Sequence, residues 1–360
     1  MKAAVLHEVG SGSIEVRDDI ESAPVVAGKV RIKIRSTGVC HSDLSAMNGT
    51  IPIPVPAVLG HEGAGEVVEV GEGVTTLAEG DHVVVCWSPQ CGRCADCLAG
   101  KPYLCMTYMM DAFSYAPFSM NGTPVFGMAG AGTFAEELIL GEDGAIKIDD
   151  DVPFDVASLV GCGVMTGAGA AINAARVEPG ASVLVIGCGG VGISAIQGAR
   201  ICGAATIVAV DMVEQKLAWA TQFGATHAVT PADLPATIAD LTGGAGFDYA
   251  FEVVGRADTI RTAYDSTRRG GTTVVVGVGR ADDMLQLSAF EVFYNEKTLR
   301  GSYYGSGNIR RDFPRLLSLW RSGQLDLEGM ITRRLSIGDV NDAFSAMQAG
   351  DVIRQVITFD

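Results

Sequence analysis

Four cysteines lie within the stretch CGRCADCLAGKPYLC, at Cys91, Cys94, Cys97 and Cys105. Thiolates at such short spacings can surround one Zn²⁺ ion tetrahedrally, and a site with four thiolates leaves no position open for a substrate. Two disulfides are the competing interpretation, but cysteines three positions apart are poorly placed to bridge. The chain has nine cysteines, an odd number, which fits metal and core roles better than a disulfide framework. The spacing therefore predicts a structural zinc site.

Three other motifs, VCHSD, GHEG and GCG, offer a different set of metal ligands. Cys40, His61 and Cys162 would supply two sulfurs and one nitrogen, the ligand set of a catalytic zinc whose fourth position is open. Glu62 could visit that position, and Asp43 could hydrogen-bond the second ring nitrogen of His61. Taken singly, each residue also fits a small core cysteine or a partly buried histidine. The sequence contains no H-E-x-x-H motif, so nothing in it favours a zinc peptidase.

The segment SVLVIGCGGVGISAIQGARICGAATIVAVD has the pattern of a dinucleotide-binding βαβ unit. Its ends, SVLVI and TIVAV, are β-branched apolar runs typical of buried parallel strands. Between them, Gly187, Gly189 and Gly192 form G-x-G-x-x-G. These glycines permit a tight turn and let backbone N–H groups approach a pyrophosphate at the start of a helix. A glycine-rich turn in some other βαβ unit is the competing interpretation.

The residue that closes the second of these strands indicates which dinucleotide binds. Asp211 could accept hydrogen bonds from the adenosine ribose hydroxyls, and its charge would repel a 2′-phosphate. Lys216 could reach the same ribose or be a solvated surface residue. The predicted cofactor is therefore NAD(H).

The elements that must position these residues change in type along the chain. From Lys2 to about Lys147, short alternating strand patterns such as VRIKIRS and HVVVCWS are separated by Gly/Pro turns. From about Glu178 to Arg300, strands alternate with helical segments, which predicts a doubly wound parallel sheet. The tail has helical patterns at residues 313–322 and 339–349 and ends in a strand, RQVITFD. The fold class is α/β.

Composition excludes several classes of partner. The chain has 360 residues, of which 48% are hydrophobic and 19% charged, as in a compact globular protein. A net charge of −16 argues against a nucleic-acid or anionic-membrane partner. The N-terminus lacks the pattern of a signal peptide. The two long uncharged stretches, residues 156–175 and 181–199, are rich in Gly and Ala and are not expected to span a membrane. We expect a cytoplasmic protein.

In their order and separations, these motifs resemble those of the zinc-dependent medium-chain alcohol dehydrogenase family, in its class I/class III-like branch, over essentially the whole chain. The resemblance implies a GroES-like, mainly β catalytic domain at residues 1–163 and 303–360. It places a Rossmann-type NAD-binding domain at residues 164–302. It further implies two Zn²⁺ ions per subunit, one catalytic and one structural, and a homodimer or homotetramer without nucleic-acid or membrane partners.

The resemblance also implies roles for individual residues. Ser42 would pass the alcohol proton outward, with Glu62 behind the catalytic zinc, and His41 and Arg354 would lie near the pyrophosphate. The further cofactor contacts that it implies are Gly190, Val191, Val276 and Val278. Some members carry a histidine at the position of Ser45 as the outer end of the proton relay, so this chain leaves that end unassigned.

The expected substrate is a primary aliphatic or aromatic alcohol, or its aldehyde, which exchanges a hydride with NAD. The apolar pocket walls implied for this choice are Ile51, Trp87, Phe113, Val278 and Tyr304. Thiol-adduct formaldehyde dehydrogenase remains an alternative, although that branch places an acid where this chain has Ile51. A second alternative is a nicotinoprotein that retains NAD and passes electrons to another acceptor. A zinc-stabilised scaffold without catalysis is disfavoured because all three catalytic zinc ligands are present.

Overall fold

The computed structural model describes residues 1–108 and 110–359, which form two compact units. The first unit comprises Met1–Gly163, Asn308–Trp320 and Leu327–Asp360. The second comprises Val164–Gly307 and Arg321–Asp326. The sequence-based boundaries placed the return to the first domain at residue 303 and did not separate the short segment 321–326.

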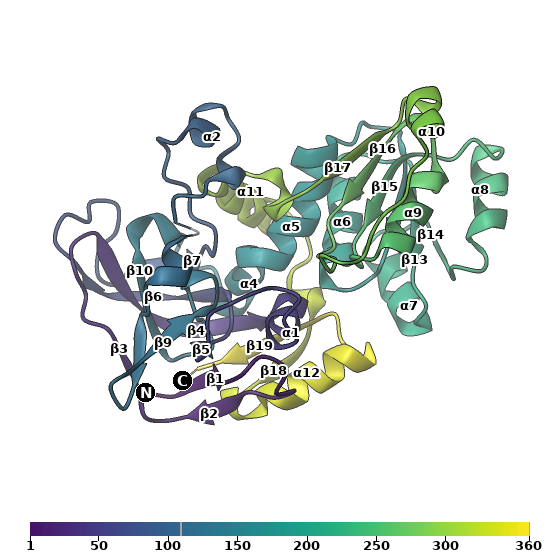
Figure 1. Ribbon diagram of the computed structural model, residues 1–360. Helices are drawn as coiled ribbons and strands as arrows, with labels where there is room; N and C mark the ends of the chain where they lie inside the picture. The colour runs from purple at the N-terminus through teal and green to yellow at the C-terminus, as the bar shows by residue number, and fades with distance from the viewer. Residues whose placement is uncertain (109, 360) are drawn as a thin grey trace. The chain divides into compact units, whose positions relative to one another are not determined.

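The first unit is mainly β structure, arranged in two sheets (Figure 1). One sheet has the strand order β2-β1-β5-β9-β8-β3, and the other has the order β11-β7-β6-β4-β19-β18, with β10 also paired to β4. The strands are β1 (Ala3–Leu6), β2 (Glu15–Arg17), β3 (Ile20–Ser22), β4 (Lys29–Val39), β5 (Ala57–Val58), β6 (Glu62–Val70), β7 (His82–Val85), β8 (Phe118–Met120), β9 (Thr123–Gly127), β10 (Glu137–Gly141), β11 (Ala145–Lys147), β18 (Ile331–Leu335) and β19 (Arg354–Thr358).

Strand β4 shows why this part of the chain forms a sheet. Its residues alternate between partly exposed and buried, and Val30, Ile32 and Ile34 are completely buried on one face. The C-terminal strand β19 pairs antiparallel with β4, with Gln355 opposite Val39. This pairing brings Arg354 close to the end of β4, where the chain turns into the first candidate metal ligand.

Helices of the first unit are few and mostly short. They are α1 (His41–Met47), α2 (Ala95–Leu98), α3 (Asp111–Ser114), α4 (Phe154–Leu159), α11 (Ile309–Arg321) and α12 (Val340–Ala349). Single 3-10 turns lie at Pro102–Leu104, Met128–Gly130, Glu142–Gly144, Glu328–Met330 and Ile337–Asp339. Helix α11 begins before the predicted residue 313, because Ile309 is buried one turn ahead of the buried Phe313.

The second unit is a parallel sheet with the strand order β14-β13-β12-β15-β16-β17 (Figure 1). Its strands are β12 (Ser182–Ile186), β13 (Thr206–Val210), β14 (His227–Val229), β15 (Phe247–Glu252), β16 (Thr267–Val275) and β17 (Thr298–Gly301). Its helices are α5 (Met165–Gly169), α6 (Gly190–Ile201), α7 (Glu214–Gln222), α8 (Leu234–Thr242), α9 (Ala257–Ser266) and α10 (Ala289–Asn295), with a 3-10 turn at Tyr304–Ser306. The order reverses between β12 and β15, the point where doubly wound sheets bind ligands.

One helical stretch among the described residues is long and apolar enough to cross a membrane, Phe154–Ala175. Since 83% of its most apolar window is buried inside the protein, it behaves as a core helix. It combines α4 and α5 with two π-helical segments, Val160–Val164 and Ala170–Ala175. The other uncharged stretch of the sequence divides into strand β12 and helix α6.

Candidate metal and cofactor sites

The four side chains of the predicted catalytic zinc site come together in the first unit. Cys40 precedes helix α1, His61 and Glu62 stand at the start of β6, and Cys162 lies in the π-helical segment. One ligand atom from each lies within 4.8 Å of all the others, and all four residues are buried. Tetrahedral zinc ligation at about 2.0–2.3 Å needs ligand atoms at separations of this order. The arrangement therefore fits one Zn²⁺ ion.

Asp43 orients the histidine of this set. Its Oδ1 lies 3.2 Å from His61 Nδ1, while its two oxygens accept hydrogen bonds from the Cys40 N–H (2.9 Å) and the Gly60 N–H (3.1 Å). Asp43 is completely buried. His61 Nε2 is also buried and has no hydrogen-bond partner among the described residues. With Nδ1 facing the carboxylate, Nε2 remains as the metal-binding nitrogen.

The electrostatics of the set favour a cation. A hydrogen bond from Cys162 holds the pKa of the Cys40 thiol well below its ordinary value, against the effect of burial. Burial by itself would lower the pKa of His61, but the Asp43 carboxylate and the interaction with Cys40 raise it to about 10. These ligands thus stabilise positive charge in their midst, which is the property that a divalent metal site requires.

Glu62 forms a buried ion pair that the sequence did not predict. Its carboxylate pairs with the Arg354 guanidinium, and its Oε1 accepts a hydrogen bond from the Gly163 N–H at 3.1 Å. A Cβ at Gly38 would lie 2.1 Å from Glu62 Oε2, so this close approach needs a glycine there. Arg354 thus has a buried carboxylate as its partner, and its place near the pyrophosphate, implied by the resemblance, stays a prediction.

The remaining predicted residues of this site surround α1. Ser42 Oγ lies 3.7 Å from Cys40 Sγ and is thus beside a candidate metal ligand, while its role in proton transfer stays a prediction. His41, the first residue of α1, is exposed. The Trp87 ring stands edge-on to the His61 ring, with centroids 6.4 Å apart. The Ile51 N–H donates to the Ser45 carbonyl (2.9 Å), which ties this expected pocket wall to α1.

Three other expected pocket walls belong to other elements of the chain. Phe113, in α3 of the first unit, is 49% exposed. Val278 and Tyr304 belong to the second unit, where Val278 is 55% exposed and Tyr304 is buried. Trp87 is the expected wall whose ring contact with a metal ligand, His61, is seen among the described residues.

The second candidate metal site is the cysteine cluster. One sulfur from each of the four cysteines lies within 4.8 Å of the other three, and all four are free thiols, so the disulfide interpretation is wrong. The Cys94 N–H and the Thr107 hydroxyl each lie 3.3 Å from Cys91 Sγ. The Thr107 contact is the main reason that the pKa of Cys91 falls to about 6. A thiolate at neutral pH is the form that binds zinc.

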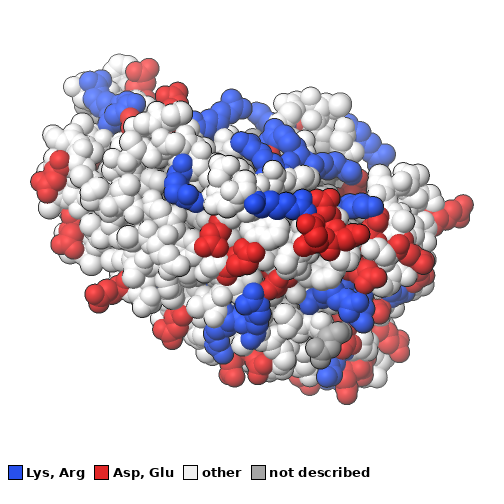
Figure 2. Space-filling view, turned by 180° about the vertical axis from the view of Figure 1, so that it is seen from behind, with Lys and Arg blue, Asp and Glu red and all other residues white. Residues whose placement is uncertain are grey.

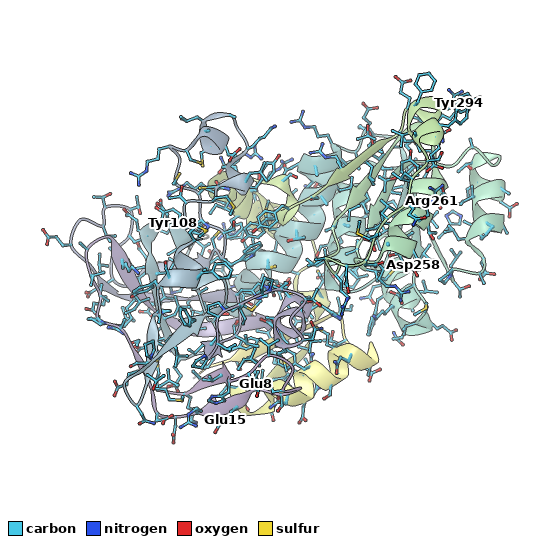
Figure 3. The ribbon with its side chains drawn as sticks, in the orientation of Figure 1. Glu8, Glu15, Tyr108, Asp258, Arg261 and Tyr294 are labelled. Carbon is cyan, nitrogen blue, oxygen red and sulfur yellow. The ribbon has the colours of Figure 1, made fainter. Side chains whose placement is uncertain are left out.

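Little apolar packing supports this cluster. Helix α2 has no buried residue, and Leu98 at its end is 76% exposed. The segment after the cluster is held by polar contacts, since the hydroxyl of Tyr108, a residue labelled in Figure 3, and the Arg310 guanidinium both pair with Asp143. Metal ligation is therefore the interaction that can hold residues 91–105, the cysteine lobe, together.

The glycine-rich turn of the second unit has the geometry expected of a dinucleotide site. Gly187 has φ of 97°, and a Cβ at Gly192 would lie 1.8 Å from the Gly187 carbonyl oxygen. Gly189 caps helix α6, and a Cβ at that position would meet nothing within 4 Å, so the approach to the helix N-terminus is open. This turn fits a pyrophosphate.

Asp211 lies beside that turn. Its carboxylate accepts hydrogen bonds from the Cys188 N–H (2.8 Å) and the Val213 N–H (3.0 Å). These bonds fix the carboxylate at the end of β13, and each oxygen retains a lone pair for a ribose hydroxyl. Lys216 is partly buried in α7.

The cofactor residues added by the resemblance occupy two places in this unit. Gly190 and Val191 form the first turn of α6, where Val191 O lies 2.1 Å from a Cβ built at Gly167. Val276 and Val278 follow β16, and Val276 is buried.

Two features of the structure were not predicted from the sequence. They are the Glu62–Arg354 pair and a buried carboxylate, Glu252, at the end of β15. Neither has a local sequence signal.

Comparisons with known proteins agree on one family. The profile of the alcohol dehydrogenase GroES-like domain matches residues 26–150, and that of zinc-binding dehydrogenases matches residues 190–322. S-(hydroxymethyl)glutathione dehydrogenase of Paracoccus denitrificans is 38% identical over 99% of both chains, and alcohol dehydrogenase class-3 of Cereibacter sphaeroides is 37% identical over 99% of both. The crystal structure of benzyl alcohol dehydrogenase from Acinetobacter calcoaceticus is similar, with a TM-score of 0.93, 31% identity, and coverage of 100% of this chain and 99% of that one.

Proposed function

Because this chain belongs to the zinc-dependent medium-chain alcohol dehydrogenase family and is thus an NAD-dependent zinc oxidoreductase, we propose that it interconverts a primary alcohol with an apolar body and its aldehyde. The observation that carries this proposal is the buried Cys40–His61–Cys162 set with the Trp87 ring beside His61. The similarity to a benzyl alcohol dehydrogenase supports an aromatic or aliphatic substrate body.

In the proposed reaction, the chain supplies ligands, a proton path and a fixed geometry. Zinc, when bound by Cys40, His61 and Cys162, supplies a Lewis acid for the alcohol oxygen, and NAD supplies the hydride acceptor. Ser42, near Cys40, receives the alcohol proton and passes it outward. When a metal displaces the proton from Nε2 of His61, the Asp43 carboxylate would keep the remaining ring proton on Nδ1 and hold the ring in its orientation.

The first alternative is oxidation of a thiol adduct of formaldehyde. It is favoured by the name of the Paracoccus relative, S-(hydroxymethyl)glutathione dehydrogenase. Against it stands Ile51, an apolar side chain where that branch is expected to carry an acid. An apolar wall offers no partner for the ammonium group of a glutathione adduct and leaves that charge desolvated.

Competition between the two substrates tests the proposal. We expect purified enzyme to reduce NAD with benzyl alcohol or hexanol at a kcat/KM at least about tenfold above that for S-(hydroxymethyl)glutathione, since a lost charge partner costs about that factor or more. The Ile51→Asp variant should shift the ratio toward the adduct, and Ile51→Leu is the matched control. Preference of the unmodified enzyme for the adduct would establish the alternative.

The second alternative concerns the electron acceptor. A nicotinoprotein would retain NAD through purification and would turn over only with an artificial acceptor. We would therefore measure the amount of nicotinamide cofactor bound per chain in the same preparation. Release of NADH into solution in proportion to the alcohol consumed would support ordinary dehydrogenase turnover.

We also propose a homodimer or homotetramer in the cytoplasm. Strand β17 ends the parallel sheet, and the preceding helix α10 exposes Phe290 (69%), Phe293 (81%) and Tyr294 (50%), the last seen at this end of the unit in Figure 3. An exposed sheet edge beside exposed aromatic rings is a common interface between copies of a chain.

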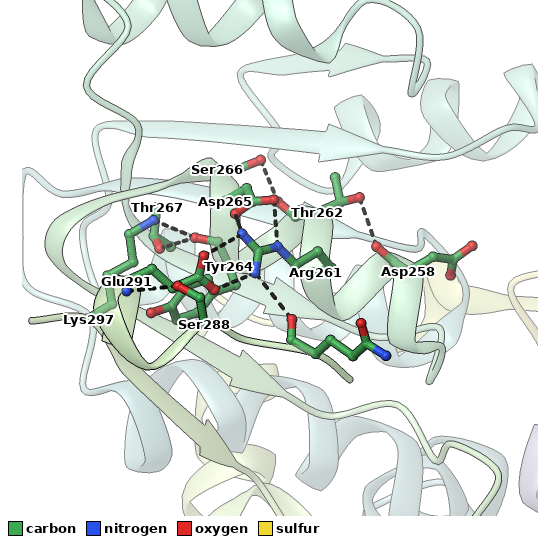
Figure 4. Close-up of polar contacts among 11 residues, drawn as sticks. Asp258, Arg261, Thr262, Tyr264, Asp265, Ser266, Thr267, Ser288, Glu291 and Lys297 are labelled. Carbon is green, nitrogen blue, oxygen red and sulfur yellow. Dashed lines mark hydrogen bonds and ion pairs between the residues drawn. The ribbon is translucent and has the colours of Figure 1, made fainter. Parts of the chain in front are cut away.

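A polar network anchors this helix to its own unit. The Arg261 guanidinium binds both oxygens of Asp265 (2.7 and 2.9 Å) and also pairs with Glu291 of α10 (Figure 4). Ser288 caps α10 by accepting a hydrogen bond from the Glu291 N–H at 3.1 Å. The aromatic face of α10 is thus presented on a fixed helix, which supports its role as an interface.

A further inference from the structure

Glu252 is a completely buried carboxylate at the centre of the second unit. It ends strand β15, opposite Ile186 of β12 on one side and Val275 of β16 on the other. No lysine or arginine forms an ion pair with it in the part of the chain that the structure describes. A buried carboxylate is costly in a protein interior unless hydrogen bonds compensate it, so its position calls for a reason.

Among the described residues, the hydrogen bonds to the Glu252 side chain are all accepted by one carboxylate oxygen. Oε1 accepts from the Val254 N–H (2.9 Å), the Gly255 N–H (2.7 Å) and the Thr259 hydroxyl (2.7 Å). Oε2 is buried and has no partner among the described residues. The carboxylate therefore binds the turn that follows β15 to the first part of helix α9 and leaves half of its own capacity unused.

That turn is tightly packed between two segments that are predicted to contact the cofactor. On one side, Val254 Cγ2 lies 2.9 Å from a Cβ built at Gly187 of the glycine-rich turn. On the other, a Cβ built at Gly255, whose φ is +84°, would lie 2.5 Å from the Val278 carbonyl oxygen. The backbone carbonyl of Glu252 also accepts a hydrogen bond from the Val276 N–H at 2.8 Å. A displacement of the turn would move both segments.

The two halves of the sheet serve different halves of a dinucleotide. Asp211 and β13 lie on the adenosine side of the switch point, so β15 and β16 with their following residues lie on the nicotinamide side. We propose that Glu252 is a positioning residue for the nicotinamide half of NAD, acting through the turn at Val254–Gly255 and the segment Val276–Val278. This inference rests on the NAD cofactor of the proposed function but on no particular alcohol.

The positioning role of Glu252 is tested by measuring how zinc-loaded enzyme binds two ligands, NADH and ADP-ribose. ADP-ribose lacks the nicotinamide. Glu252→Leu removes the acceptor for two backbone N–H groups, and we expect it to weaken NADH binding about tenfold and ADP-ribose binding less than about threefold. Glu252→Gln keeps an acceptor oxygen and should bind both ligands within about threefold of the unmodified enzyme. Dissociation constants are measured by NADH fluorescence and by calorimetry.

Two further variants keep the test decisive. Thr273 lies on the neighbouring strand β16, and its buried hydroxyl has no hydrogen-bond partner among the described residues. Thr273→Val should therefore leave the affinities for NADH and ADP-ribose unchanged. If Glu252→Leu does not fold, Thr259→Val loosens the same carboxylate and should weaken NADH alone, by about threefold. Equal loss of NADH and ADP-ribose, or loss of neither, would overturn the positioning role. Because no alcohol is present, a wrong substrate assignment does not affect the comparison.

Discussion

At the residue scale, the candidate catalytic site is built from buried charges that compensate one another. Asp43 faces His61, and Glu62 faces Arg354, with all four side chains nearly inaccessible to water. Removal of one member of such a pair leaves the other charge buried and uncompensated, which is strongly destabilising. The residues around the metal ligands are therefore as sensitive to substitution as the ligands themselves.

Asp43→Asn should weaken the catalytic metal site without removing a ligand. The amide no longer holds the Nδ1 proton of His61 by charge, and loss of such a partner costs about 10–100-fold in metal affinity or activity. Zinc affinity is measured by competition with a chelator. Asp351→Asn, an exposed position in the same unit, is the control. Unchanged affinity in Asp43→Asn would contradict the assigned role.

Cys40→Ser should abolish turnover in a protein that still folds. We expect the zinc content to fall from two ions to one per chain and kcat to fall at least about 10³-fold, because metal-ion catalysis supplies several kcal/mol. NADH binding, which uses the second unit, should persist. Retention of both zinc ions and of activity would show that Cys40 is not a ligand.

The ligands themselves could be predicted because metal chemistry restricts their types and because each stands in a short motif. The Glu62–Arg354 pair could not be predicted from the sequence. Its members are distant in sequence, and only the pairing of β19 with β4 brings Arg354 close to the start of β6. Glu252 escaped notice for a similar reason, since its burial depends on the strands on both sides of it.

At the element scale, the cysteine lobe contrasts with the strands around it. Strands β12 and β13 begin and end where predicted, because their β-branched residues are bounded by turn residues and buried on both faces. The lobe contains only a single four-residue α-helix and a 3-10 turn, with neither holding a buried residue. The two π-helical segments of Phe154–Ala175 were not predicted, since a π turn depends on packing contacts rather than on local pattern.

Cys94→Ser should therefore reduce stability before it reduces chemistry. We expect one zinc ion fewer per chain and a melting temperature lowered by about 2–4 °C for each kcal/mol lost. Thermal unfolding and zinc content are measured together, with Cys202→Ser, outside both metal sets, as the control. If stability and zinc content stay unchanged, the structural assignment of the cluster is wrong.

At the scale of the whole molecule, the sequence predicted the fold class of each unit better than it predicted which segments of the chain make up that unit. Alternating strands and helices are sufficient for a doubly wound sheet. The return of the C-terminal tail to the first unit came from the family resemblance, because long-range pairing such as β19 with β4 has no local signal. The net charge of −16 does not form a single-sign surface on the face in Figure 2, where acidic and basic side chains are interspersed.

Phe293→Asp should dissociate the proposed oligomer. A buried carboxylate in an interface without a partner costs more than a typical aromatic contact provides. Light scattering after size exclusion should then report the mass of one 37.5 kDa chain where the unmodified protein gives a multiple of it. Leu98→Asp, which alters an equally exposed apolar residue of the first unit, should leave the mass unchanged. A monomeric unmodified protein would refute the proposal.

The spacing of the two cysteine sets has a consequence for the order in which the nascent chain acquires its metals. All ligands of the cluster have been synthesised once Cys105 is added, whereas the other set waits for Cys162. Closing the longer loop from Cys40 to Cys162 also costs about 2 kcal/mol more in chain entropy than closing the cluster. We therefore expect zinc to enter the cluster first, during synthesis. The catalytic ion should enter last, after the first unit has assembled.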